Sequence, residues 1–264
     1  MRAKKIGFLL CILLVSSGLI MMLYPYISKS LALKESDDSS AAYQKAFADL
    51  SEDEIGQIYD RAAEYNVRRS NNERLEDYEN MLRIEESGIL GSIEIPKLHL
   101  KLNIYHTADM EILKKGIGHI PDSSLPVPGE AVHSVLSGHT GLPTMTAFDD
   151  LDQVRIGDIF YLDVLGRRYC YEVDQIKIVL PEECSDYLFL EDGKTYVTLL
   201  TCTPYGINTH RLLVRGCYIG EESVESFLSE GEVNAGCFYL SCLFIGGISC
   251  LIVIKRVGKR AKRK

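Results

Sequence analysis

The chain has no Cys-x-x-Cys pair among its eight cysteines and no EF-hand pattern. The first absence argues against a zinc site, because structural zinc sites draw their thiolates from closely spaced pairs. The second means that its acidic residues lack the spacing of a dedicated calcium loop. The sequence also lacks internal repeats and low-complexity tracts. We therefore expect a globular protein that uses no metal and no other cofactor.

Acidic residues are missing from both ends of the chain. Residues 1–28 and 255–264 hold ten of the 29 basic residues and none of the 37 acidic ones. Residues 29–254 therefore combine 19 basic with 37 acidic side chains, a formal charge of −18 that the whole-chain value of −8 hides. Such a body repels nucleic acid and suits basic, lysine-bearing protein partners.

Two apolar runs lie next to these basic ends. Ile6–Ile27 is uncharged and, at 22 residues, long enough to span a bilayer; Ala235–Ile254 is the second run. The positive-inside rule places both termini in the cytosol and the residues between the two spans outside the cell. A cleaved signal peptide is the alternative for the first run, with Ser30-Leu31-Ala32 as a weak cleavage site.

The middle of the chain changes from a helical to a strand pattern. Ser51 and Glu54 form a capping-box sequence ahead of an amphipathic helical stretch. From Gly91 onward apolar residues alternate, which predicts many short strands and a closed β-barrel. The clearest predicted strands are 132–136, 159–164, 169–179, 196–202 and 211–219.

A cysteine and an arginine mark the ends of the last two predicted strands. Cys202 ends one strand and Arg211 begins the next, and a turn-forming segment with Pro204 and Gly206 joins them. Strands joined in this way run antiparallel, so both side chains should meet at one sheet edge. A thiol beside a fixed cation suits a thiolate nucleophile and an oxyanion clamp, and His139, in a Gly-rich loop after an apolar strand, is the candidate general base.

Thr198-Leu199-Leu200-Thr201-Cys202, with His139 upstream and Arg211 downstream, resembles the sortases, the membrane-bound cysteine transpeptidases of Gram-positive bacteria. The longer run from Cys202 to Gly216 is similar to the class C, pilin-polymerising branch. The resemblance covers roughly residues 88–220 and implies the eight-stranded sortase barrel. It implies Cys202, His139 and Arg211 as catalytic residues, without metal or cofactor. Thr201 either binds substrate or packs as a strand residue.

The sequence allows more than one interpretation of several other residues. Arg215 is the second candidate for the clamp, whereas His133 and His210 are read as structural. A disulfide between Cys170 and Cys184 would suit an oxidising exterior, but spacing alone does not establish it. Many class C sortases carry an Asp-Pro-aromatic lid over the cysteine. The corresponding segment, 65–87, contains no proline, so the lid is either absent or built differently.

These observations predict a mainly β protein, a sortase-type barrel with N-terminal helices and a transmembrane helix at each end. The expected parts are a membrane anchor (1–28), a helical region (29–87), the catalytic barrel (88–220), a linker (221–234), a transmembrane helix (235–254) and a basic cytosolic tail (255–264).

The resemblance implies cleavage of an LPxTG-type sorting signal between Thr and Gly, followed by transfer to a pilin lysine. The expected partners are LPxTG-bearing pilins and surface proteins and the lipid bilayer, with no nucleic acid. One alternative is a sortase that anchors proteins to cell-wall precursor, and another is an inactive membrane-anchored scaffold.

Overall fold

The computed structural model describes residues 2–73, 75–141 and 147–222. Residues 1–224 form one compact unit, and a second unit, 225–264, lies outside the described residues. The expected linker, C-terminal span and basic tail therefore fall almost wholly outside the part of the chain that is described.

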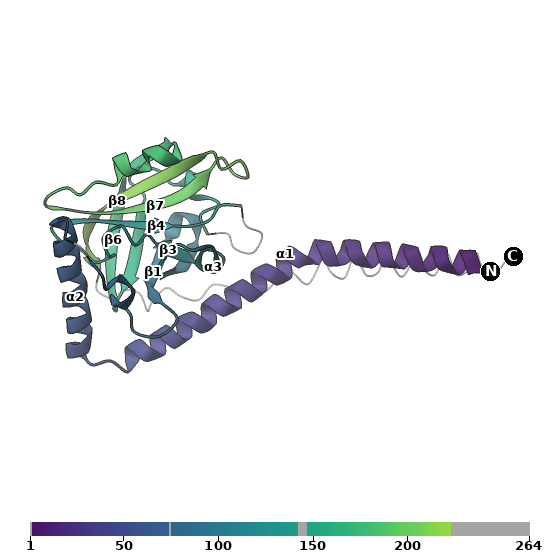
Figure 1. Ribbon diagram of the computed structural model, residues 1–264, viewed down its shortest axis with the longest axis horizontal. Helices are drawn as coiled ribbons and strands as arrows, with labels where there is room; N and C mark the ends of the chain where they lie inside the picture. Colours follow the sequence, from purple (N-terminus) through teal and green to yellow (C-terminus); the bar gives the residue numbers. More distant parts are fainter. Residues whose placement is uncertain (1, 74, 142–146, 223–264) are drawn as a thin grey trace. The chain divides into compact units, whose positions relative to one another are not determined.

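Eight strands close into a barrel, as predicted (Figure 1). Their order around the barrel is β1-β2-β3-β4-β7-β8-β6-β5, and β1 pairs with β5 to close it. The pairs β2–β3 and β4–β7 are parallel and the other pairs are antiparallel. The strands are β1 (Ile89–Ile95), β2 (Leu100–Tyr105), β3 (Ile117–His119), β4 (Ala131–Ser137), β5 (Ile159–Val164), β6 (Arg167–Val179), β7 (Lys194–Thr203) and β8 (His210–Glu222).

Alternation along the strands separates the inside of the barrel from its outer face. Val197 and Leu199 of β7 and Val214 of β8 are fully buried in the core. The intervening residues of β7 point to the opposite face, because successive side chains of a strand alternate. Cys202 therefore lies on the outer face, whereas its neighbour Thr201 points inward.

Two helices precede the barrel. α2 (Glu52–Ser70) begins with the predicted capping box: Ser51 N donates to Glu54 Oε2 at 2.9 Å, and Glu54 N donates to Ser51 Oγ at 3.3 Å. This helix lies beside the barrel (Figure 1). Its buried Asn66 bonds to both the N–H and the carbonyl of Leu125, at 2.8 and 3.0 Å. These two bonds attach α2 to the loop that leads into β4.

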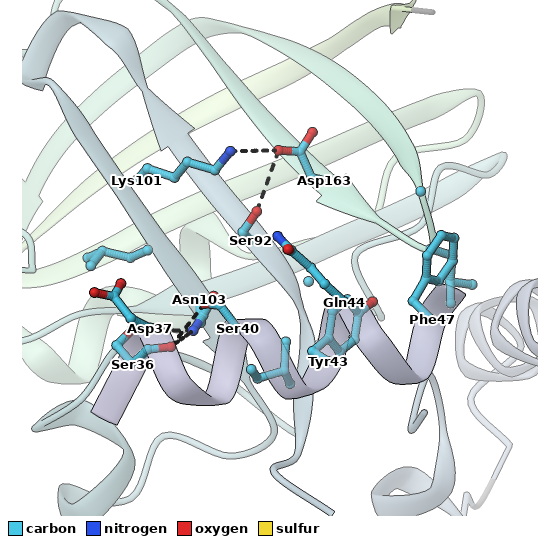
Figure 2. A pocket seen from close by; sticks show the side chains of 15 residues that line it. Ser36, Asp37, Ser40, Tyr43, Gln44, Phe47, Ser92, Lys101, Asn103 and Asp163 are labelled. Atoms are coloured by element: carbon cyan, nitrogen blue, oxygen red, sulfur yellow. Dashed lines mark hydrogen bonds and ion pairs between the residues drawn. The ribbon is translucent and has the colours of Figure 1, made fainter. Parts of the chain in front are cut away.

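The C-terminal part of the first helix, α1 (Arg2–Ala48), contacts the barrel (Figure 2). Asn103 of β2 donates to the carbonyl of Ser36 at 3.1 Å and accepts from Ser40 Oγ at 2.9 Å. A cavity of about 530 Å³ lies between α1 and the strands β1, β2 and β5. In the strand order this is the side of the barrel opposite β7, so the cavity is remote from Cys202.

The structure does not support the two expected membrane spans. Within the described residues, no helix has both the length and the apolar composition needed to cross a bilayer. The first expected span, 6–27, lies in α1, where the side chains of 2–11 and 25 are outside the described set. The second, 235–254, is wholly outside it. Both spans stay predictions.

The segment after α2 packs on the barrel and contains a 3-10 turn, Tyr78–Asn80. Tyr78 OH donates to Nδ1 of His119 at 2.8 Å, and Nε2 of His119 donates to the carbonyl of Ser124 at the same distance. Burial lowers the pKa of His119 to about 4, which agrees with this neutral hydrogen-bonding pattern. These contacts hold 71–88 against the barrel near β3.

Candidate active site

The β7–β8 hairpin brings the predicted nucleophile and clamp together. Cys202 and Arg211 are direct partners in the antiparallel ladder. Directly opposed residues have Cα atoms about 4.5–5.5 Å apart and project from the same face. In the connecting loop the N–H groups of Ile207 and Asn208 both donate to the carbonyl of Pro204 at 3.0 Å. The two side chains therefore share the outer face at the end of the sheet.

The loop also holds the arginine. Nη1 of Arg211 donates to the carbonyls of Asn208 and His210, at 3.2 and 3.1 Å. Asn208 has a φ of 60°, a left-handed conformation that asparagine tolerates better than most residues. One edge of the guanidinium is therefore fixed by its own loop. The remaining N–H groups can donate to a developing oxyanion.

Arg215, the second candidate for the clamp, has other partners. It forms a two-pronged ion pair with Asp174, with N–O distances of 2.9 and 2.8 Å. Its guanidinium carbon also lies 4.1 Å from the ring centroid of Tyr196. Its partner in β7 is Thr198, four residues before Cys202. The geometry favours Arg211 over Arg215 for the clamp.

His139 reaches the site from the neighbouring parallel strand. Ser137 of β4 pairs with Leu200 of β7, and the N–H of Gly138 donates to the carbonyl of Leu200 at 3.0 Å. The same register, continued two residues beyond the end of β4, would match position 139 with position 202. Burial lowers the pKa of His139, which favours a neutral imidazole that can accept a proton. Its Nε2 lies 3.1 Å from Sδ of Met110.

Thr201 connects the loop that contains His139, here called the histidine loop, to β7, the strand that contains Cys202. Its side chain is only 2% exposed, and its hydroxyl donates to the carbonyl of Gly138 at 2.7 Å. The same hydroxyl accepts from Oγ1 of Thr140, which also lies 3.3 Å from the carbonyl of Phe148. The residues on both sides of His139 are therefore bonded to the residue before Cys202. This arrangement favours Thr201 as a packed strand residue over a direct role in binding substrate.

A glycine before His139 is needed for this close approach. A Cβ atom added at Gly138 would lie 2.5 Å from Cδ2 of Phe148. Any larger residue would clash with Phe148 and Ile117, so the segment before His139 or these side chains would have to move. The sequence did not predict Gly138 and Thr140 as positioning residues, although they flank His139 directly in the chain.

Cys170, Cys184, Cys202 and Cys217 are free thiols, so the Cys170–Cys184 bridge is not formed in this structure. Burial raises the pKa of Cys170, Cys184 and Cys217. The charge of Arg211 partly offsets this effect at Cys184, which places that thiol near the site. In the described ranges no cluster of three or more His, Cys, Asp or Glu side chains is arranged for a metal ion.

The structural reading of His133 agrees with its contacts. Its Nε2 accepts from Thr198 Oγ1 at 2.7 Å, and its Nδ1 donates to the carbonyl of Phe189 at 2.8 Å. These bonds fasten the β6–β7 connection over the outer face of the sheet. His210 lies beside the site, where Nδ1 contacts the hydroxyl of its neighbour Thr209 at 2.9 Å.

A groove lies over β4, with His133 and Val135 of that strand in its lining. It encloses about 510 Å³ between β4, the β3–β4 loop, the β6–β7 connection and the C-terminal end of α2. Its apolar lining is Ile120, Val135, Leu188 and Leu190, and Arg69, Glu73 and Asp122 add charges at the α2 side.

Comparisons with known proteins agree with this geometry. Residues 93–218 match the model of the sortase domain. The chain is 41% identical to sortase C1 from Streptococcus agalactiae, with a TM-score of 0.66 over 69% of this chain and 98% of the other. It is 43% identical to a sortase C from Clostridium perfringens solved with the C-terminal cell wall sorting motif, with a TM-score of 0.65 over 70% of this chain and 100% of the other.

A more distant relative is sortase D of Bacillus subtilis (strain 168), 34% identical over 115 residues. That match covers 44% of this chain and 54% of the relative. The chain therefore belongs to the sortase family, in its class C branch.

Proposed function

We propose that the chain is a cysteine transpeptidase that cleaves an LPxTG-type sorting signal between Thr and Gly and joins the Thr carboxyl to a lysine amine of a pilin subunit. The observation that carries this proposal is the direct pairing of Cys202 with Arg211, with His139 at the end of the adjacent strand. Membership of class C supports pilin as the acceptor, because pilin polymerisation is the activity of that branch.

The proposed reaction has two steps. The sulfur of Cys202 attacks the Thr carbonyl while neutral His139 takes the thiol proton, and Arg211 stabilises the oxyanion. The C–N bond to Gly then breaks, and the histidine returns its proton to the leaving amine. In the second step a lysine amine attacks the thioester carbonyl, His139 accepts its proton, and the sulfur of Cys202 leaves.

The test of this reaction uses the purified full chain with a pilin subunit that carries a sorting signal. We expect covalent ladders on a denaturing gel, and Cys202→Ala should abolish them while leaving the fold intact. Thioester formation without ladders, followed by transfer to cell-wall precursor, would favour the anchoring alternative. Absence of any thioester in the wild-type chain would favour an inactive scaffold.

Attachment to the cell membrane, with the barrel outside and both termini in the cytosol, is part of the proposal. The sequence alone supports it, through the apolar runs 6–27 and 235–254 and the basic residues that flank them. Protease added to intact protoplasts should remove the barrel and spare a tag placed after Lys264. Loss of that tag would contradict the two-span topology.

A further inference from the structure

The groove along β4 extends beyond the reach of the sorting motif. Val135 lines it and lies four residues before His139, a distance of about 13 Å along a strand. An extended peptide advances at a similar rate, so the groove should be reached about four residues before the Thr whose carbonyl is attacked. In an LPxTG signal that position lies just before the Leu.

We expect the groove to bind the part of the substrate that precedes the scissile bond, not the part that follows it. It stays attached to Cys202 through both steps of the proposed reaction, whereas the Gly side must leave and the acceptor amine must enter. A groove with a floor on β4 and walls on the β6–β7 connection and α2 can hold the retained half. The exchanging half needs an open approach.

The far wall of this groove contains a cation, Arg69, and the carboxylates of Glu73 and Asp122 line the same groove. Arg69, near the C-terminal end of α2, is half-buried, and among the described residues it forms no ion pair and its guanidinium donates no hydrogen bond. Burial raises the pKa of Tyr65 and lowers that of His119; the charge of Arg69 opposes the first shift and adds to the second. The adjacent Arg68, in contrast, is paired with Glu73 at 3.1 Å. A partly desolvated guanidinium gains most from a carboxylate, which it can bind with two parallel hydrogen bonds.

We infer that Arg69 is a specificity residue that binds an acidic side chain located one to three residues before the Leu of the sorting signal. The inference rests on the proposed function and adds a subsite to it. The overall charge of the protein cannot produce this preference, because residues 29–254 carry −18 and disfavour an acidic peptide. A preference for an acidic residue would therefore be a local effect of the groove.

The experiment compares peptides that carry one Glu or one Lys at each of these three positions, with acylation of Cys202 in the full chain as the readout. For at least one position we expect the wild type to acylate with the Glu peptide about tenfold more efficiently, as one charge-assisted contact would give. Arg69→Gln should remove the preference and Arg69→Glu should reverse it. Arg68→Gln is the matched control, because it removes the neighbouring charge from the same helix, and it should leave the preference intact.

The outcomes separate this inference from the proposed function. Acylation without a Glu preference at any position, or a preference that survives in Arg69→Glu, would overturn the role of Arg69 and leave the transpeptidase intact. Loss of the preference in Arg68→Gln as well would show a general charge effect and would also overturn it. Failure of the wild type to acylate with any peptide would refute the proposed function and, with it, the subsite.

Discussion

Replacing Thr201 with valine should separate the positioning of the site from the stability of the barrel. The two side chains have the same shape, so the change removes only a buried hydroxyl. That hydroxyl donates to the carbonyl of Gly138 at 2.7 Å and contacts Thr140. Without it the Gly138 carbonyl loses its side-chain donor, and Thr140 retains only its bond to Phe148. Leaving that buried carbonyl without its donor costs about 1–3 kcal/mol.

The same change should also slow the chemistry, because both neighbours of His139 lose their contact with the Thr201 hydroxyl, and Gly138 keeps only its backbone bond to Leu200. We expect the acylation rate of Cys202 by an LPxTG peptide to fall about tenfold or more, since a displacement near 1 Å is sufficient for such losses. The rate is measured by intact mass in a single turnover, well below the unfolding transition. Thr201→Ser keeps the hydroxyl and should acylate close to the wild-type rate.

Thr198→Val is the control for a general effect of losing a hydroxyl on β7. Thr198 is 1% exposed and donates to His133 at 2.7 Å, so its loss should destabilise the fold by about 1–3 kcal/mol. It has no bond to the His139 loop, and its acylation rate at saturating peptide should stay near that of the wild type. Equal rate losses in the two valine variants, or normal acylation by Thr201→Val, would refute the positioning role.

Three further predictions follow from the same geometry. Arg211→Lys should lower the single-turnover acylation rate about 100-fold, whereas Arg215→Lys should be much milder; the reverse result would place the clamp at Arg215. An alkylating reagent should label Cys202 faster than Cys184, as peptide mass spectrometry can show, because burial raises the pKa of Cys184; preferential labelling of Cys184 would contradict the nucleophile assignment. The folded-state pKa of His119 lies near 4, below its ordinary 6.5, so its contribution to stability is complete above about pH 6.5 and is lost as the pH falls towards 4, by up to about 3 kcal/mol. The free energy of unfolding, measured in urea at pH 7 and pH 4.5, should therefore depend less on pH in His119→Gln than in the wild type. An unchanged pH dependence would refute this origin.

Sequence alone predicts the barrel well because its longer strands have a clear two-residue period. The expected strands 132–136 and 196–202 correspond to β4 and β7, which extend only a few residues further. The predicted cap at Ser51 is likewise confirmed, because capping depends on residues three apart. β3 was not predicted, since its three residues are too few to show a period.

The meeting of His139 with the hairpin depends on a pairing that sequence cannot supply. The Cys202–Arg211 pairing follows from one short turn, a local feature. His139 lies 63 residues before Cys202 and reaches it only through the parallel β4–β7 register. From the sequence, only the resemblance to the sortases placed His139 and Cys202 in one site. The threonine contacts were unpredictable for the same reason, because each joins atoms on different strands or loops.

The alternation of β7 links the position of Cys202, the predicted nucleophile, to the stability of the barrel. Thr201 points inward and holds the histidine loop, while Cys202 points outward beside Arg211. A register shift of one residue would exchange their faces, because the side-chain period of a strand is two. Such a shift would have to break the ladders with both neighbours, which extend from Ala131↔Lys194 to Ser137↔Leu200 and from Tyr196↔Cys217 to Thr203↔His210. The sheet therefore fixes the cysteine, and the β7–β8 loop fixes the arginine through Asn208. Changes in that loop should consequently alter stabilisation of the oxyanion while leaving the exposure of the thiol unchanged.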